Sequence, residues 1–147
     1  MFFLGSDHRG FDLKEKVKNY LERENIECMD CGTYSKEIAH FPLIAKEICN
    51  KMDKQKDKAI LICSCGIGMS MAANKFRGIR AGVCFNKLSA QDGKEHSDIN
   101  VLVLPGEFLS EQEAIEIIEI WQNSEFLNGR YTDRLQMIEK IEEENMK

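Results

Sequence analysis

The chain has 147 residues, of which 43% are hydrophobic and 31% are charged. This composition is sufficient for one domain with a hydrophobic core and argues against disorder. The formal net charge is −5, and no basic stripe with interleaved aromatic residues appears, so we expect no nucleic-acid partner.

No apolar run approaches the 18 or more residues of a membrane span, and the first seven residues lack the basic start and the length of a signal peptide. We therefore expect a cytoplasmic protein with no membrane partner. In that compartment the six cysteines are expected to be free thiols rather than a disulfide framework. Two cysteine pairs, Cys28 with Cys31 and Cys63 with Cys65, invite a zinc interpretation. We expect no metal, because Cys28 falls inside one predicted strand and Cys63 ends another, whereas zinc ligands favour loops.

Strand and helix patterns alternate along the chain with short connections, which predicts an α/β fold with a doubly wound parallel sheet. The expected strands are 2–5, 26–30, 59–63, 79–85 and 101–104. Apolar residues at helical spacing predict a first helix that contains Leu13, Val17, Tyr20 and Leu21. The later helices are expected at 42–52, after the glycines that follow Cys63, at 89–95, from the capping box at Ser110 and Glu113, and at 132–144.

The segment 60–75 is the most informative part of the chain. The apolar run 59–63 is too short for a helix and fits a strand that is covered on both faces. Gly66 and Gly68 then let the backbone turn into a helix, with its N–H groups facing a negative group. The pattern predicts an anion-binding turn, with Cys63 at its opening as a nucleophile or base.

Other polar residues follow from the same topology. Asp7 and His8 come directly after the first strand, so they are expected at the same sheet edge as Cys63 and Cys65, whereas His96 precedes the fifth strand. Simpler interpretations exist. Asp7 is also a suitable helix N-cap, and a single histidine is usually an ordinary surface residue. The two glycines alone lack the full spacing of a dinucleotide-binding fingerprint.

Taken together, these residues resemble a known family, the type B ribose-5-phosphate isomerases and the related galactose-6-phosphate isomerase subunits. The likeness runs nearly end to end. The matching motifs are Gly5-Ser-Asp-His8 with Gly10-Phe11, Asp30-x-Gly32-Thr33, Ile62-Cys63-x-x-Gly66-x-Gly68-x-Ser70, Ala72-Ala-Asn-Lys75, Gly78-Ile-Arg80-Ala81, Ser89-Ala-Gln91, His96-x-Asp-x-Asn100-Val101, and Gly129-Arg130 with Arg134.

The resemblance implies a single Rossmann-like domain, with a five-stranded parallel sheet and a C-terminal helix, over residues 1–147. It also implies an aldose–ketose isomerase that converts ribose 5-phosphate to ribulose 5-phosphate through an enediolate, without metal or cofactor. By the same carry-over, Cys63 is the base, His96 opens the sugar ring and Asp7 positions sugar hydroxyls. The implied substrate-binding residues are His8, Ser64, Gly66, Ile67, Gly68, Ser70, Ser97, Arg130 and Arg134. The partners that the resemblance implies are a phosphorylated sugar and other copies of the chain, in a homodimer or homotetramer with shared active sites.

Local chemistry agrees with part of this assignment. A glycine-rich turn at a helix N-terminus is expected to lower the pKa of Cys63. Cys65 stands where the family usually has Thr or Ser, and it competes with Cys63 as the reactive thiol. The i, i+4 spacing of Arg130 and Arg134 puts both on one helical face, where they can grip one dianion. Without the family pattern, a solvated face near the acidic tail is the simpler interpretation.

Departures from the family leave the substrate open. Glu107 replaces an arginine that is common after the fifth strand, with Arg9 as a compensating charge, and Tyr131 replaces a common histidine. His40 and Phe41 replace Asp and Tyr. The alternatives are an isomerase of another pentose or hexose phosphate, a non-catalytic sugar-phosphate-binding module and, more remotely, a dinucleotide-binding protein.

Overall fold

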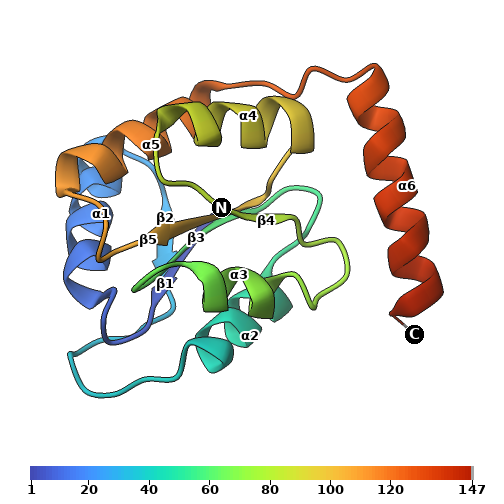
Figure 1. The fold of residues 1–147 in the computed structure, drawn as a ribbon. Coiled ribbons are helices and arrows are strands. Elements are labelled where there is room, and N and C mark those ends of the chain that lie inside the picture. Colours follow the sequence, from blue (N-terminus) through green and yellow to red (C-terminus); the bar gives the residue numbers. More distant parts are fainter. Residues whose placement is uncertain (147) are drawn as a thin grey trace.

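Residues 1–146 of the computed structural model form a five-stranded parallel sheet between two layers of helices (Figure 1). The strand order is β2-β1-β3-β5-β4. The strands are β1 (Phe2–Ser6), β2 (Cys28–Asp30), β3 (Lys58–Cys63), β4 (Ala81–Val83) and β5 (Val101–Pro105). The helices are α1 (Phe11–Arg23), α2 (Phe41–Lys51), α3 (Ile67–Ala73), α4 (Lys87–Ser97), α5 (Glu111–Asn123) and α6 (Arg130–Asn145). The predicted α/β fold with a parallel sheet is confirmed.

Side chains that alternate along the central strands build a core on each face of the sheet. Ile60 and Ile62 pack on one face with α1, α4 and α5, whereas Ala59 and Leu61 pack on the other face with α2 and α3. All four of these residues are fully buried, as is the whole apolar part of β5. Two-sided burial explains why β3 and β5 read as continuous apolar runs.

The side of the sheet to which successive strands are added changes between β1 and β3, which are neighbours in the sheet. From β1 the chain moves outward to β2, and from β3 it moves the opposite way, toward β5 and β4. The first crossover helix, α1, covers one face, and the second, α2, covers the other. In open α/β sheets such a switch point leaves a crevice at the carboxyl ends of the two strands, which is where ligands bind.

The last helix is an exception to this packing. Within Arg130–Asn145 no residue is buried, and Figure 1 shows α6 beside the three-layered body, joined to it by an extended segment after α5. One tether is the carboxylate of Glu142, whose Oε1 accepts from the Gly78 N–H at 2.9 Å. Across the described residues, no helix is long and apolar enough to span a membrane.

Several elements differ by about two residues at an end from the bounds predicted from the sequence. α4 begins two residues earlier than predicted, because Asn86 and Ser89 form a reciprocal capping box that the sequence reading overlooked. The predicted box at Ser110 and Glu113 is confirmed at the start of α5. The two short strands, β2 and β4, are shorter than predicted, since both lie at sheet edges, where one neighbour is missing.

Candidate active site

The turn between β3 and α3 has a shape that only glycine permits at two positions. Gly66 has φ +81°, a left-handed conformation, and a Cβ there would lie 2.9 Å from Val83 Cγ1. A Cβ on Gly68 would lie 2.6 Å from the Phe41 ring. These glycines allow the backbone to fold tightly over the end of β3, so that amide groups surround the Cys63 sulfur.

Cys63 lies at the base of this turn with 4% of its surface exposed. Burial raises the pKa of its thiol, whereas the backbone N–H groups of Met69 and Gly66 act in the opposite direction. The nearby Asp7 carboxylate raises the pKa further. The prediction of a lowered pKa is therefore wrong in sign, because desolvation of a buried thiolate outweighs the stabilisation from the amides of one short turn.

Asp7 and His8 lie with Cys63 at the carboxyl ends of the parallel strands, as predicted. Asp7 Oδ1 accepts the N–H groups of Arg9 at 3.0 Å and Gly10 at 2.9 Å, which shapes the loop that leads into α1. Helix α1 itself starts at Phe11 without a side-chain cap. His8 Nδ1 lies 3.3 Å from both the amide nitrogen and the carbonyl oxygen of Ala39, so the imidazole is tied to the loop before α2.

The turn after β5 completes this edge. The N–H of Gly106 donates to the Cys63 carbonyl at 2.8 Å, and the N–H of Glu107 donates to the Ser64 carbonyl at 3.0 Å. Ser64 and Cys65 are half-buried. Of the other predicted binding residues on this turn, Ile67 is exposed, whereas Gly68 and Ser70 are half-buried. The structure thus brings the first half of the predicted site together as one surface.

His96 lies at the other end of the sheet, where the parallel strands begin. It lies in the last turn of α4, shortly before β5, whose first residue Val101 pairs with Ala59 and whose last residue pairs with Cys63. A five-residue strand spans roughly 13 Å, so His96 and Cys63 of one chain lie at opposite ends of the sheet. Ser97, the next residue, lines a cavity of about 350 Å³ between β4 and α6.

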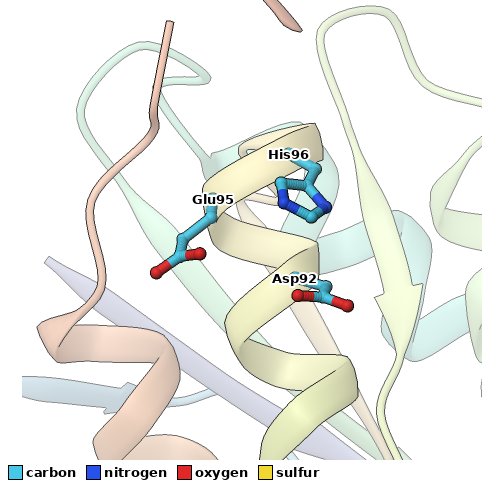
Figure 2. A group of neighbouring side chains, drawn as sticks. All are labelled: Asp92, Glu95 and His96. Atoms are coloured by element: carbon cyan, nitrogen blue, oxygen red, sulfur yellow. The ribbon is translucent and has the colours of Figure 1, made fainter.

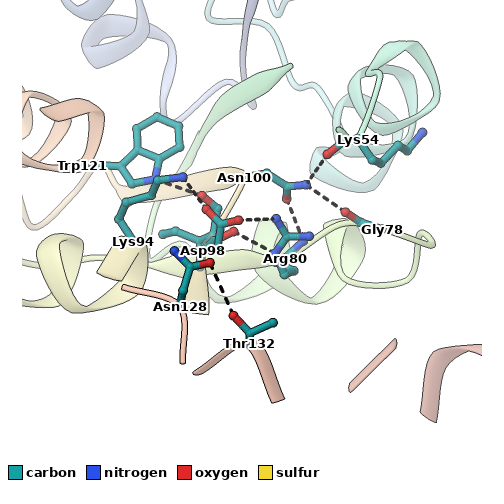
Figure 3. A network of polar contacts seen from close by, with 10 residues as sticks. Lys54, Gly78, Arg80, Lys94, Asp98, Asn100, Trp121, Asn128 and Thr132 are labelled. Atoms are coloured by element: carbon teal, nitrogen blue, oxygen red, sulfur yellow. Dashed lines mark hydrogen bonds and ion pairs between the residues drawn. The ribbon is translucent and has the colours of Figure 1, made fainter. Parts of the chain in front are cut away.

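The end of α4 that carries His96 is held by a polar network (Figure 3). Asp98 ends the helix in a left-handed conformation, and its carboxylate pairs with both Arg80 and Lys94. Arg80 Nε also donates to the Asp98 carbonyl at 2.8 Å. Asn100 joins this network to the β4 side, because its Oδ1 accepts the Arg80 N–H at 2.8 Å and its Nδ2 donates to the Gly78 carbonyl, also at 2.8 Å.

The predicted phosphate-binding arginines lie close to His96. The His96 ring stacks on Tyr131, with ring centroids 4.6 Å apart and an interplanar angle of 12°. The guanidinium carbons of Arg130 and Arg134 lie 5.1 and 5.6 Å from the Tyr131 centroid. The second half of the predicted site is therefore also one cluster, distinct from the Cys63 cluster in the same chain.

Among residues 1–146, one group has enough neighbouring donor atoms to be considered for a metal. Asp92, Glu95 and His96 place one ligand atom each within 4.8 Å of one another on α4 (Figure 2). Glu95 already accepts from Gln91 Nε2 at 3.0 Å. No cysteine of the described chain joins such a group, so the zinc interpretation of the cysteine pairs gains no geometric support.

Comparison with known proteins decides the family. The model of the Ribose/Galactose Isomerase family matches residues 2–138. This chain belongs to that family. Ribose-5-phosphate isomerase B of Escherichia coli K12 is 37% identical over 140 residues, which are 95% of this chain and 94% of that protein.

Solved structures of Ribose/Galactose Isomerase family members have the same fold. A Clostridium thermocellum ribose-5-phosphate isomerase B superposes with a TM-score of 0.94 at 35% identity and covers 97% of both chains. The Mycoplasma genitalium ribose-5-phosphate isomerase B with bound ribulose 5-phosphate gives a TM-score of 0.89 at 32% identity, with 98% of this chain and 97% of that chain covered. Similarity at this level extends over the whole sheet and both clusters.

Sequence reasoning missed the residues that hold the second cluster in place. The network of Arg80, Asp98 and Asn100 appeared only as motif matches, although a charged or amide side chain next to a buried strand start is a signal of hydrogen bonding. Tyr131 was noted only as a departure from the family. Its stacking partner lies 35 positions away in the sequence, and no local pattern predicts such a contact.

Proposed function

We propose that this protein is an aldose–ketose isomerase that interconverts ribose 5-phosphate and ribulose 5-phosphate through an enediolate, with Cys63 as the base. The observation that carries the proposal is the position of Cys63 at the switch point of the sheet, beneath a turn of backbone amides and beside Asp7. The names of the relatives and the ligand of the Mycoplasma genitalium protein support the reaction class.

The chemistry follows from these surroundings. The Cys63 thiolate takes the C2 proton of the open-chain aldose, and electrons move to the C1 carbonyl oxygen. A proton then passes from the C2 hydroxyl to that oxygen, and the proton held by the thiol is delivered to C1, which leaves the C2 carbonyl of the ketose. Backbone N–H groups at the start of α3, those of Ile67 and Gly68, stabilise the negative oxygen of the enediolate, where one good donor contributes about 3 kcal/mol. A raised pKa lowers the fraction of thiolate but makes each thiolate a stronger base toward a weakly acidic C–H bond.

The remaining roles are assigned by position. Asp7 positions sugar hydroxyls, and His8 contacts the sugar or its phosphate. His96 assists opening of the furanose ring, Ser97 lies beside it, and Arg130 with Arg134 holds the phosphate as two charge-assisted donors. Because the His96 cluster lies at the opposite edge from Cys63, we assign it to the site of a second copy of the chain.

A homodimer is therefore part of the proposal, with a tetramer as its extension. α6 buries none of its residues in its own chain, and it exposes Met137, Ile138 and Ile141. An unburied apolar stripe beside a cavity is the surface that a second copy would cover in a symmetric interface. The cytoplasmic location expected from the sequence stays a prediction.

The test is an assay with purified protein in deuterated water that contains EDTA, using a panel of pentose and hexose phosphates with ribose 5-phosphate and galactose 6-phosphate among them. NMR follows the ketose product and deuterium incorporation at C2. Turnover of ribose 5-phosphate is expected. Turnover of a different sugar would retain the proposed reaction but change the substrate. This second candidate, an isomerase of another sugar phosphate, is favoured by the unusual residues Glu107 and Phe41. Binding without exchange on any sugar would replace the proposal with a non-catalytic sugar-phosphate-binding module.

A further inference from the structure

The Tyr131 ring contacts three groups that the proposed function places in the second cluster, the imidazole of His96 and the guanidinium groups of Arg130 and Arg134. One side chain stacks on the His96 imidazole at 4.6 Å and lies beneath the cationic groups of Arg130 and Arg134. In addition, Arg130 Nη2 donates to the Tyr131 hydroxyl at 3.1 Å. Tyr131 is half-buried, whereas both arginines are exposed, so the aromatic ring is the ordered centre of the group.

The two sides of this stack differ in how firmly they are held. On the α4 side, His96 is followed by Asp98, which Arg80 and Lys94 fix through its carboxylate (Figure 3). On the α6 side, the helix has no buried residue, although the Leu127 N–H donates to the Glu95 carbonyl at 3.0 Å and so anchors the segment that leads to α6. The stacked ring of Tyr131 lies between these two sides and links the arginines to the imidazole.

A tyrosine is suited to this task. It has only two rotatable side-chain bonds, so holding it in place costs little entropy, and its π face attracts both a guanidinium and an imidazole. Its hydroxyl adds a directional bond to Arg130. The side chain reaches all three partners without itself being an acid or base that the reaction requires.

Resting on the proposed function, we infer that Tyr131 is a positioning residue that sets the spacing between the ring-opening imidazole of His96 and the phosphate-holding guanidinium groups of Arg130 and Arg134. The substrate is a sugar phosphate whose ring oxygen and phosphate are joined through C4, C5 and O5, so that their separation varies only over a narrow range. A rigid spacer between the two recognition groups aligns the closed sugar ring for opening, and it has less influence on proton transfer at Cys63.

Two reactions of the same enzyme separate these steps. Ribose 5-phosphate closes a five-membered ring, so its conversion requires ring opening. Ribulose 5-phosphate carries its phosphate on the oxygen that would have to close such a ring, so it stays open. Exchange of its C1 proton with solvent therefore needs proton transfer but not ring opening. The ratio of ribose 5-phosphate kcat to the C1 exchange rate, both at saturating substrate, isolates the contribution of His96 and its positioning.

The experiment compares Tyr131→Leu, which keeps bulk without an aromatic face, with Tyr131→Phe, which keeps the ring, and with His96→Ala as a reference. We expect Tyr131→Leu to lower kcat for ribose 5-phosphate by about 10- to 100-fold, to lower C1 exchange much less and to raise KM for both sugars. Tyr131→Phe should keep the wild-type ratio and raise KM only slightly. Tyr131→His, which introduces the residue common in the family, should recover part of the loss.

Two outcomes would overturn the inference: equal loss of both rates in Tyr131→Leu, as a general structural defect would give, or no change in either. Circular dichroism and the oligomeric state of each variant accompany the rates. If wild-type protein fails both assays, it is the proposed function that is wrong, so the two failures are distinguishable.

Discussion

Arg9 Nη1 donates to Glu107 Oε1 across 3.1 Å, and this ion pair links the loop after β1 to the turn after β5 at the edge where Cys63 lies. Both side chains are more than half exposed, at 60% and 51%. Such a pair adds little to stability, because solvent screens it. Its importance is electrostatic: the cation neutralises a carboxylate beside a site proposed to bind a dianion.

Removal of Arg9 should therefore impair substrate binding more than folding. For Arg9→Ala we expect KM for the sugar phosphate to rise roughly 3- to 10-fold at low salt, with kcat nearly unchanged, because Glu107 then repels the phosphate without compensation. Arg9→Ala combined with Glu107→Gln should return KM close to wild type. A steady-state double-mutant cycle at two ionic strengths measures this. An unchanged KM in the single variant would show that the carboxylate lies too far from the phosphate to matter.

Replacement of the proposed base should separate catalysis from binding. We expect Cys63→Ala to lose about 10²- to 10⁴-fold in kcat while it still binds sugar phosphate, because binding rests on the arginines and backbone amides. Calorimetric titration with ribulose 5-phosphate measures the binding. The matched control is Cys65→Ser, two positions away, which introduces the hydroxyl usual in the family and should retain or raise activity. If Cys65→Ser is inactive and Cys63→Ala is active, the two thiols have exchanged roles.

The pH profile should reflect the raised pKa of the Cys63 thiol. The base acts as a thiolate, and the thiolate fraction grows as pH increases toward the pKa. Since burial moves this pKa above its usual 9.0, kcat/KM should still be rising at pH 9 rather than level near pH 7. Alkylation of Cys63 by iodoacetamide, followed by mass spectrometry, should show the same dependence. A plateau below pH 7 in both measurements would mean that the amides of the turn lower the pKa after all.

Mixing two inactive variants tests whether two chains complete each site. Cys63→Ala and His96→Ala disable opposite clusters. After subunit exchange at equal concentrations, half of the dimers are mixed, and each mixed dimer has one site with both residues intact. About a quarter of the wild-type activity should return. If each site is built from one chain, the mixture stays as inactive as its components, and analytical ultracentrifugation of the same samples reports whether exchange occurred.

Lys14 should be important for stability although it does not take part in the reaction. Its side chain is fully buried, and Nζ lies 2.6 Å from Asp30 Oδ2. We expect Lys14→Met to reduce the free energy of unfolding by about 3 kcal/mol, because the carboxylate loses its closest buried cation. Lys18, at 3.4 Å from the same oxygen, limits the loss. The control is Lys36→Met, whose pair with Asp12 is exposed and should contribute less than about 1 kcal/mol in urea unfolding.

The fold was predictable because its central strands carry an unambiguous signal. The apolar runs that became β3 and β5 are buried on both faces, and the alternation of elements leaves few topologies with parallel strands. Edge strands gave weaker signals, since β2 and β4 have a neighbour on one side only and none of their residues is fully buried. Apolar periodicity did not predict the start of α4, because that start depends on the capping box that Asn86 forms with the hydroxyl of Ser89.

Topology predicts where the candidate site residues lie in the sheet, but it does not predict their contacts. Asp7 and Cys63 follow neighbouring strands, so topology alone brings them to one edge. His96 precedes its strand, and the same rule places it at the opposite edge. The sign of the Cys63 pKa shift could not be deduced from the sequence, because it depends on how deeply the fold buries the thiol and on how near the Asp7 carboxylate lies. The His96–Tyr131 stack depends on the path of the segment between α5 and α6, which the sequence pattern does not determine.

The sparse packing of α6 has a consequence for its dynamics. A helix with no buried residue opens at little cost in free energy, so in a solitary chain its backbone amides should exchange with solvent hydrogen far faster than those of β3. Association would slow that exchange, because covering the apolar stripe of α6 raises the cost of opening. If two copies of the chain pair through this stripe, as proposed, the protection of residues 130–145 should increase with chain concentration.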